Sequence, residues 1–252
     1  MVSGEGVQSI GRAFDVLETV AEHGPMSLSR LAAEAGLPLT TVHRLVGTLV
    51  GLGYLRPESV GSAKHYVLAP RLIHLGERAS RSLSRWAVPH LTALVDALGE
   101  TANLAMLDGD RIVYVAQVPS RHSMRMFTEV GRRVLPHATA VGKALMARLP
   151  ASEVEAIVGR TGLPALTTRT LTSADDLDAA LADIRSAGYA VDNGEQEDGV
   201  RCVAVALSEP GRSLALSISG PASRVDEGLV ARAVPVLTVA AAALAADLDT
   251  AR

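Results

Sequence analysis

Three short polar segments in the second half of the chain contain residue types that could do chemistry. The first is residues 136–144, a loop that enters a helix. Backbone N–H groups at a helix start, helped by the helix dipole, bind a carboxylate or a phosphate without a cationic side chain. A simple cap at Thr139 would leave the same pattern, and the GxxxxGK[ST] spacing of a P-loop is missing. The segment indicates either an anion site or an ordinary helix start.

The second segment is the acidic turn at residues 192–199, which leads into Val200-Arg201-Cys202. Asp192 and Glu195 could serve as a general acid and base or as ligands of a hard cation. An acidic loop in solvent would have the same composition. Both interpretations stay open on this segment alone.

The third segment is the strand end that holds Ser217 and Ser219. Side chains repeat every two residues along a strand, so both hydroxyls lie on one face of the expected sheet. Cys202 would need a nearby base to be a nucleophile, and no His is near it in the sequence. We therefore expect a thiol that lines a pocket, with no catalytic residue, cofactor or metal. Together the three segments describe a small polar pocket.

The composition of the chain limits the class of protein to which these segments can belong. The chain has 252 residues, of which 48% are hydrophobic and 20% charged, enough for one large or two ordinary packed domains. A single cysteine excludes an internal disulfide and fits a reducing compartment. The longest uncharged apolar stretch, residues 233–246, is shorter than the roughly 20 residues that cross a bilayer, and no secretory signal is visible. We expect a cytoplasmic protein with no membrane partner.

The first 69 residues show short helical patterns separated by Gly and Pro. Residues 9–22 predict a helix with Ile10, Phe14, Leu17 and Ala21 on its buried face, and Ser27 is the expected N-cap of a second helix at 28–35. A third helix at 39–52 should bury the apolar residues Val42, Leu45, Val46 and Leu49. Residues 54–56 and 65–68 predict two strands joined by a loop at 57–64, whose tip is Gly61-Ser62.

This order of elements is that of a winged helix-turn-helix, a small core that presents one exposed helix. Although the net charge is −3, residues 40–71 contain four cations against Glu58 alone, a local charge of +3. We expect this surface to bind DNA through short hydroxyls and cations suited to phosphates and base edges. The predicted DNA-binding residues are Thr40, Thr41, His43, Arg44 and Thr48 of the third helix and Arg56 and Lys64 of the wing. A protein-interaction module is the alternative.

A helical linker at residues 70–84 should join this domain to a second domain at 85–252. The linker has a partial apolar stripe, Leu72, Leu75 and Ala79, and a further helix at 86–98 should be buried through Val88, Leu91, Leu94, Val95 and Leu98. Further helices are expected at 139–149, 174–187 and 224–248. Strands are expected at 103–107, 111–117, 124–128, 133–135, 189–192, 200–207 and 213–219, the last two joined through Glu209-Pro210-Gly211. The pattern predicts an α+β domain with an antiparallel sheet.

Several motifs resemble the IclR family of transcriptional regulators. In the first domain these are GPMSLSRLA at 24–32, GLP at 36–38, TVHRL at 41–45 and GYL at 53–55. In the second they are LPHATAVGKAL at 135–145, DNGE at 192–195, GVRCVA at 199–204 and SISGP at 217–221. The resemblance runs from about residue 9 to residue 244, in the same order and spacing.

The resemblance implies a GAF-like second domain that binds a small molecule and shifts the DNA affinity of a homodimer or tetramer. It implies that backbone N–H groups of Ala140 and Val141 hold the carboxylate of a small oxo-acid. A ureide such as allantoin or a small aromatic acid is an alternative ligand in the same family. Two sets of side chains match the family's effector site. The polar ones are Asp192, Cys202, Ser217 and Ser219, and the apolar wall consists of Met126, Val134 and Val200.

The function predicted is therefore that of a DNA-binding regulator, a repressor rather than an activator, on a palindromic operator in double-stranded DNA. Two helices, residues 40–49 of each protomer, would enter successive major grooves, with the hairpin at 56–66 along the backbone or in the minor groove. One competing hypothesis is an enzyme that uses Cys202 or the Asp192/Glu195 pair, with a helical regulatory appendage. Another is a protein-interaction adaptor, which would bind no DNA.

Overall fold

The computed structural model divides into two compact units, Met1–Ala79 and Ser80–Arg252, which we call the N-terminal and the C-terminal unit. It describes residues 7–60, 63–126, 128–208 and 213–250. The predicted wing tip Gly61-Ser62 and the predicted turn Glu209-Pro210-Gly211 lie outside the described residues. The two units are described separately.

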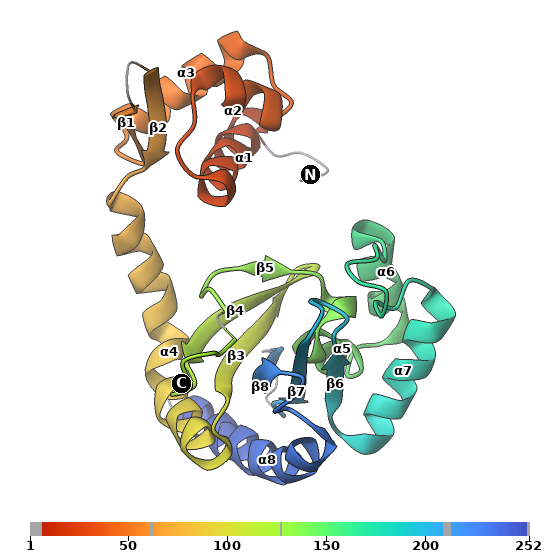
Figure 1. The fold of residues 1–252 in the computed structure, drawn as a ribbon. Helices are drawn as coiled ribbons and strands as arrows, with labels where there is room; N and C mark the ends of the chain where they lie inside the picture. The colour runs from red at the N-terminus through yellow and green to blue at the C-terminus, as the bar shows by residue number, and fades with distance from the viewer. Residues whose placement is uncertain (1–6, 61–62, 127, 209–212, 251–252) are drawn as a thin grey trace. The chain divides into compact units, whose positions relative to one another are not determined.

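The N-terminal unit has three helices followed by a β-hairpin, the predicted winged helix-turn-helix (Figure 1). Its elements are α1 (Gln8–His23), α2 (Leu28–Glu34), α3 (Leu39–Gly51), β1 (Leu55–Val60) and β2 (Ala63–Leu68). Ser27 caps α2 as predicted, because its side chain accepts a hydrogen bond from the Arg30 N–H at 3.4 Å.

The core of this unit confirms the prediction for α3 and corrects it for α1. Val42, Val46 and Leu49 of α3 are buried, and Leu45 is half-buried against them. In α1 only Leu17 of the predicted face is buried, whereas Ile10 and Phe14 are 58% and 59% exposed and Ala21 is exposed. The structure buries Val16, Leu17 and Val20 instead, because this is the face that packs on α3 and β2. Helix α1 has two apolar faces, and periodicity alone does not say which one packs.

The wing strands are longer than predicted, and the loop between them is shorter. Pro57 to Val60 were expected in the loop but lie in β1, where Glu58 pairs with His65 and Pro57 with Tyr66. A Pro that cannot donate to a ladder is tolerated here because both strands of a two-stranded sheet are edge strands.

One continuous helix, α4 (Arg71–Leu98), replaces the two helical segments predicted at 71–84 and 86–98, with Pro89 inside it. Its second half packs through Ala87, Leu91, Leu94 and Val95. The predicted burial of Leu75 and Val88 is wrong: both are exposed, since neither lies on the packed stripe. The side chain of Ala79 lies outside the described residues.

The C-terminal unit is built on a six-stranded sheet in the order β5-β4-β3-β8-β7-β6, with every neighbouring pair antiparallel. The strands are β3 (Thr101–Asp108), β4 (Arg111–Val118), β5 (Arg133–Val134), β6 (Ala190–Asn193), β7 (Val200–Ala206) and β8 (Leu214–Pro221). The predicted hairpin at Asp108-Gly109-Asp110 is confirmed. The strand predicted at 124–128 is wrong for its described residues, which form a loop; Phe127 lies outside them.

Helices cover both faces of this sheet (Figure 1). On one face lie α8 (Glu227–Thr250) and the second half of α4; on the other lie α5 (Ala140–Met146), preceded by the 3-10 turn η1 (Pro136–Ala138), and α7 (Ala174–Ala187). Helix α7 has the predicted bounds, with Ser173 as its cap and Gly188 at its end. The structure adds α6 (Ala151–Thr161), which packs against α7 and the end of α5.

Helix α8 is long and apolar enough to cross a membrane by length and composition alone. One face of it, which includes Leu229, Ala233, Leu237 and Leu244, is buried against the sheet. Leu237 and Leu244 are fully buried beside Leu216 and Ile218 of β8. The packing is that of the core helix of a folded domain.

Gly142 in α5 allows η1 to lie against the helix, which yields a stability prediction. A Cβ at position 142 would lie 2.1 Å from the backbone oxygen of Pro136, whereas one at Gly159 in α6 would meet nothing within 4 Å. Gly142→Ala should therefore lower the free energy of unfolding by about 1–3 kcal/mol or more. Gly159→Ala should raise it by about 0.5–1 kcal/mol, because Ala is the better helix former. Urea unfolding of both variants measures this, and a neutral Gly142→Ala would contradict the packing described.

Candidate functional site

The predicted DNA-facing residues of α3 lie on its outer surface. Thr40, His43, Arg44 and Thr48 are exposed and Thr41 is half-buried, while Val42 on the opposite face is fully buried. The helix therefore presents one polar face and fixes the other in the core of the unit.

These side chains differ in how free they are to contact DNA. Thr48 donates its hydroxyl to the backbone oxygen of Arg44 at 3.0 Å, which occupies its proton within the helix. On the wing, Arg56 forms an exposed ion pair with Glu58 at 3.4 Å, and the Lys64 ammonium lies 5.5 Å from the centre of the Tyr66 ring. The Arg44 guanidinium has no ion pair with any described residue, so it is the best placed cation on α3 to bind phosphate or a base edge.

A small polar cavity of about 30 Å³ lies in the C-terminal unit, between α5, the turn after β6 and the sheet. Eight of the nine predicted effector-site residues line it: Met126, Ala140, Val141, Asp192, Val200, Cys202, Ser217 and Ser219. The ninth, Val134, is buried in β5 and packs beside Val141 in the core behind the cavity wall. The cavity also has walls that the sequence did not predict, from Tyr114, Thr128, Thr139, Gln196 and Glu197.

Strand register brings the polar wall residues together. Asp192 of β6 lies opposite Cys202 of β7, and Cys202 lies opposite Ser219 of β8. Ser217 is two residues from Ser219 and shares its face, as the alternation in the strand predicted. A row of a carboxyl, a thiol and two hydroxyls therefore crosses three strands on the face covered by α5.

Asp192 is buried at the far end of this row. Its Oδ1 accepts a hydrogen bond from the Glu195 N–H at 2.7 Å, which closes the turn after β6. The pKa of Asp192 is raised to about 6: burial is the largest cause and the Glu195 carboxyl also raises it, while that backbone hydrogen bond and Lys143 lower it. The carboxyl is thus a group whose charge changes close to physiological pH.

A buried ion pair between Lys143 of α5 and Glu195 joins two walls of the cavity. Both side chains are almost fully buried, and the Glu195 backbone oxygen also accepts a hydrogen bond from the Thr170 hydroxyl at 2.7 Å. Glu195 was predicted as a candidate catalytic carboxylate, and its pairing with Lys143 was not predicted. A lysine on an otherwise apolar helix is the signal that could have indicated it.

The titration behaviour of Cys202 and His137 does not favour a nucleophile and base. Burial raises the pKa of the Cys202 thiol well above its usual value, and the Asp192 carboxylate raises it further. Burial lowers the pKa of His137, whose Nε2 lies 3.2 Å from the backbone oxygen of Pro164. A protonated thiol is a poor nucleophile, so these two residues do not favour covalent catalysis.

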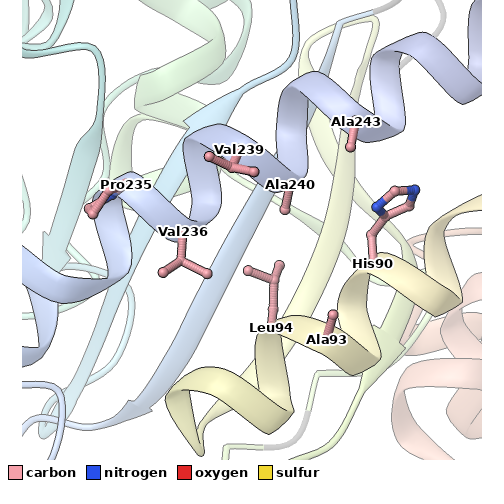
Figure 2. Close-up of a pocket in the computed structure, with 8 residues that line it drawn as sticks. All are labelled: His90, Ala93, Leu94, Pro235, Val236, Val239, Ala240 and Ala243. Atoms are coloured by element: carbon pink, nitrogen blue, oxygen red, sulfur yellow. The ribbon is translucent and has the colours of Figure 1, made fainter.

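A second and larger hollow, of about 490 Å³, lies between α4 and α8 (Figure 2). Its wall is apolar apart from His90, which bonds to Asp247 at 2.8 Å, and Leu94 and Val236 point toward each other across it. It contains none of the predicted effector residues. The groups that could orient a small polar molecule are in the smaller cavity. Among the described residues, no group of three or more His, Cys, Asp or Glu could hold a metal ion.

Comparison with known protein families and sequences gives one consistent result. Residues 9–59 match the family described as "IclR helix-turn-helix domain", and residues 79–246 match "Bacterial transcriptional regulator IclR C-terminal". The chain is 36% identical over 231 residues to the transcriptional repressor IclR of Escherichia coli, covering 89% of this chain and 84% of that protein. It is 34% identical over 248 residues to the regulator KdgR of E. coli, covering 97% and 94%.

Solved structures agree over the whole chain. An IclR transcriptional regulator from Alicyclobacillus acidocaldarius superposes with a TM-score of 0.83 at 28% identity, covering 96% of this chain and 98% of that one. An IclR homologue from Microbacterium hydrocarbonoxydans, crystallised in complex with 4-hydroxybenzoate, gives a TM-score of 0.78 at 26% identity, covering 96% and 100%.

The matched families and relatives identify the chain as a transcriptional regulator with an N-terminal helix-turn-helix domain and a C-terminal α+β domain. The chain belongs to the IclR family. The family predicted from the motifs is thereby confirmed.

The raised pKa of Asp192 yields a prediction about stability and pH. Because its pKa is about 6 in the folded chain against 3.8 ordinarily, the folded state binds the proton more tightly. The contribution to stability is full below pH 3.8 and is lost as pH rises to about 6, by up to about 3 kcal/mol. Asp192→Asn keeps the acceptor for the Glu195 N–H and removes the titration.

Urea unfolding at pH 4.5 and pH 7 measures the effect as a difference between proteins. The unfolding free energy of the wild type should fall relative to that of Asp192→Asn as pH rises. Other carboxyls titrate in both proteins and cancel in this comparison. Parallel pH profiles for the two proteins would show that Asp192 titrates normally.

Proposed function

We propose that this regulator is a repressor that binds a palindromic operator in double-stranded DNA as a homodimer, and that a small organic acid in the C-terminal cavity modulates its affinity. The residues proposed to contact DNA are Thr40, Thr41, His43, Arg44, Thr48, Arg56 and Lys64. Those proposed to contact the effector are the lining residues predicted from the sequence, with Val134 as support behind them. Such a regulator works in the cytoplasm, where Cys202 stays reduced.

The observation that carries the proposal is the meeting of predicted effector residues in one cavity. The first N–H groups of a helix have no partner within the helix, and Thr139 accepts only that of Gly142, at 3.1 Å. The amides of Ala140 and Val141 lie at the cavity wall, opposite the hydroxyls of β8. An acid with a further oxygen can use both walls, as can a ureide. The 4-hydroxybenzoate bound by the Microbacterium homologue supports an organic acid.

The size of the cavity requires it to open when an effector binds. A volume of about 30 Å³ holds about one water molecule and no organic acid. The loop after β4 carries Met126 and Thr128 over it and is held at two carbonyls. Thr101 donates to the oxygen of Met126, and Arg224, which is paired with buried Glu100, donates to that of Met124, both at 2.9 Å.

An apolar stripe on α1 supports self-association. Val7, Ile10 and Phe14 lie at helical spacing and are 65%, 58% and 59% exposed in the single chain. Three large apolar side chains in a row on a soluble helix mark an interaction surface. A second copy of the chain can cover the stripe symmetrically, which would pair two recognition helices for a palindrome.

Selection of sheared genomic DNA from the source organism on the purified chain tests the regulator directly. At about 0.15 M salt weak phosphate binding is suppressed, so enriched fragments report specific sites. We expect one or a few palindromic sites to be enriched. If folded protein enriches nothing, with or without a panel of small organic acids, operator recognition is refuted.

Arg44→Ala tests the recognition helix on a fragment found in this way. Loss of a bidentate contact to a base or phosphate costs about 1–3 kcal/mol in each protomer, or at least about 2 kcal/mol in the dimer, so operator affinity should fall at least about 30-fold. Fluorescence anisotropy with a labelled fragment measures this. Arg185→Ala, an exposed arginine in the C-terminal unit, is the matched control and should bind as the wild type does. Wild-type affinity of Arg44→Ala would rule out α3 as the recognition helix.

Phe14→Ser tests the α1 stripe. Removing an apolar side chain of this size from a symmetric interface costs about 1.5–3 kcal/mol per copy, so self-association should weaken more than 10-fold. Analytical ultracentrifugation over a range of concentrations gives the dissociation constant. Leu166→Ser, an exposed leucine in the C-terminal unit, should leave that constant unchanged. If both variants dimerise as the wild type does, the stripe is not the interface.

A further inference from the structure

A chain of side-chain hydrogen bonds crosses the sheet from β4 to β8 beside the effector cavity. Gln117 donates through Nε2 to Asn103 Oδ1 at 3.1 Å. Asn103 in turn donates through Nδ2 to Ser219 Oγ at 3.0 Å and to Ser217 Oγ at 3.4 Å. Neither Gln117 nor Asn103 lines the cavity. Their influence on a ligand therefore passes through the two serines.

The direction of this chain follows from the chemistry of the amide side chain. A carboxamide accepts at its oxygen and donates at its nitrogen, so the partner on one side determines what the other side offers. The Gln117 N–H at Asn103 Oδ1 leaves the N–H groups of Asn103 facing the serines. Asn103 is 1% exposed, so no bulk water competes for these groups. A buried polar row of this kind has one consistent orientation.

Each serine that accepts from Asn103 keeps its own proton for another acceptor. In the strand register Ser219 lies opposite Cys202, whose thiol is a weak acceptor, and the Ser219 hydroxyl lowers the pKa of that thiol against the larger effect of burial. Ser217 lies opposite Ala204, which has no acceptor in its side chain. The strongest acceptor that both hydroxyl protons could meet is an oxygen atom of a ligand in the cavity.

We propose that Asn103, oriented by Gln117, is a positioning residue that makes Ser217 and Ser219 hydrogen-bond donors, so that the β8 wall selects a ligand with acceptor-only oxygens there. A carboxylate or keto oxygen fits this wall, and an ammonium or amide N–H does not. The opposite end of the row, the carboxyl of Asp192, is the place for a donor on the ligand. The selection of a ligand rests on the effector function proposed above. The orientation of the Asn103 side chain does not, because it exists in the protein without a ligand.

Two substitutions at Gln117 test the orientation without touching the cavity. Gln117→Glu offers only an acceptor, so Asn103 should turn its nitrogen toward Glu and its oxygen toward the serines. Ser219 would then donate its proton to Asn103, so that this proton is no longer available to the neighbouring Cys202 sulfur or to a ligand. Gln117→Lys offers only a donor and should keep the wild-type orientation. Gln117 is half-buried near the end of β4, where either side chain can be accommodated.

The sulfhydryl of Cys202 reports the result, because it is the only cysteine in the chain. The S–H stretching band in the Raman spectrum, at pH 7 and without ligand or DNA, responds to a hydrogen bond at the sulfur. We expect the band to shift in Gln117→Glu and in Ser219→Ala, and to stay at the wild-type frequency in Gln117→Lys. An unshifted band in folded Gln117→Glu, or in Ser219→Ala, would overturn the proposal.

A second measurement tests the selectivity of the serine wall with two small probes. Acetate offers only acceptors and methylammonium only donors, and each is added as its sodium or chloride salt to the full chain. Both probes are added at one concentration, five times the dissociation constant of acetate. At that concentration acetate should raise the thermal midpoint by about 2–4 °C more than methylammonium does. The double variant Ser217→Ala/Ser219→Ala should lose this difference.

No shift with acetate in the wild type, or an acetate shift that persists in Ser217→Ala/Ser219→Ala, would contradict the selectivity. Neither measurement needs an operator, so the outcomes separate from those of the proposed function. A shifted Raman band in a protein that binds no specific DNA would refute the regulator alone. A selected operator together with an unshifted band would refute the role of Asn103 alone.

Discussion

The buried ion pair between Lys143 and Glu195 is the interaction on which the architecture of the effector site depends. It links α5, whose first residues form one wall of the cavity, to the turn that carries Asp192 on another. Two charges removed from water are tolerated only as a pair, and loss of one partner would leave the other uncompensated at a cost of about 3–5 kcal/mol. The pair therefore holds the two walls at a fixed separation, and the Thr170 hydroxyl holds the turn from its other side.

This rigidity on one side of the cavity makes the opposite side the one that can respond to a ligand. The loop over the cavity packs few side chains inward, whereas α5 is buried throughout its length. The sheet wall is equally constrained, because its serines are bonded to Asn103 and through it to Gln117. Under the proposed function, an effector larger than the cavity must move one of its walls, and such a movement is the proposed origin of the change in DNA affinity.

Local signals in the sequence were sufficient for much of the fold. Helix α7 could be predicted with its bounds because its cap, its apolar period and its terminal Gly188 agree. The face of α1 could not, since Phe14 and Val16 are equally apolar and only the position of α3 decides which is buried. The continuity of α4 was also missed: the prediction divided it at residue 85 into segments 71–84 and 86–98, whereas the structure has one helix that passes through residue 85.

The proposed effector site could likewise be predicted only in part from the sequence. Most of its lining residues were found because the family motifs mark them, and the strand alternation places Ser217 beside Ser219. The Lys143–Glu195 pair joins residues 52 positions apart, and Asn103 bonds to Ser217 and Ser219, which are 114 and 116 positions away. Their geometry depends on strand order and register, in particular on β3 lying between β4 and β8. One sequence without its fold does not contain that information in any local pattern.

The central claim is that occupancy of the small cavity changes the affinity of the recognition helices for an operator. The most direct test is the affinity of the full chain for a fragment selected from genomic DNA, measured while a panel of small oxo-acids, aromatic acids and ureides is titrated. Coupling of the usual size predicts a change of about 5- to 150-fold with one member of the panel, and none in Ser219→Ala. An operator affinity that stays constant at concentrations where that compound is shown to fill the cavity would contradict the account.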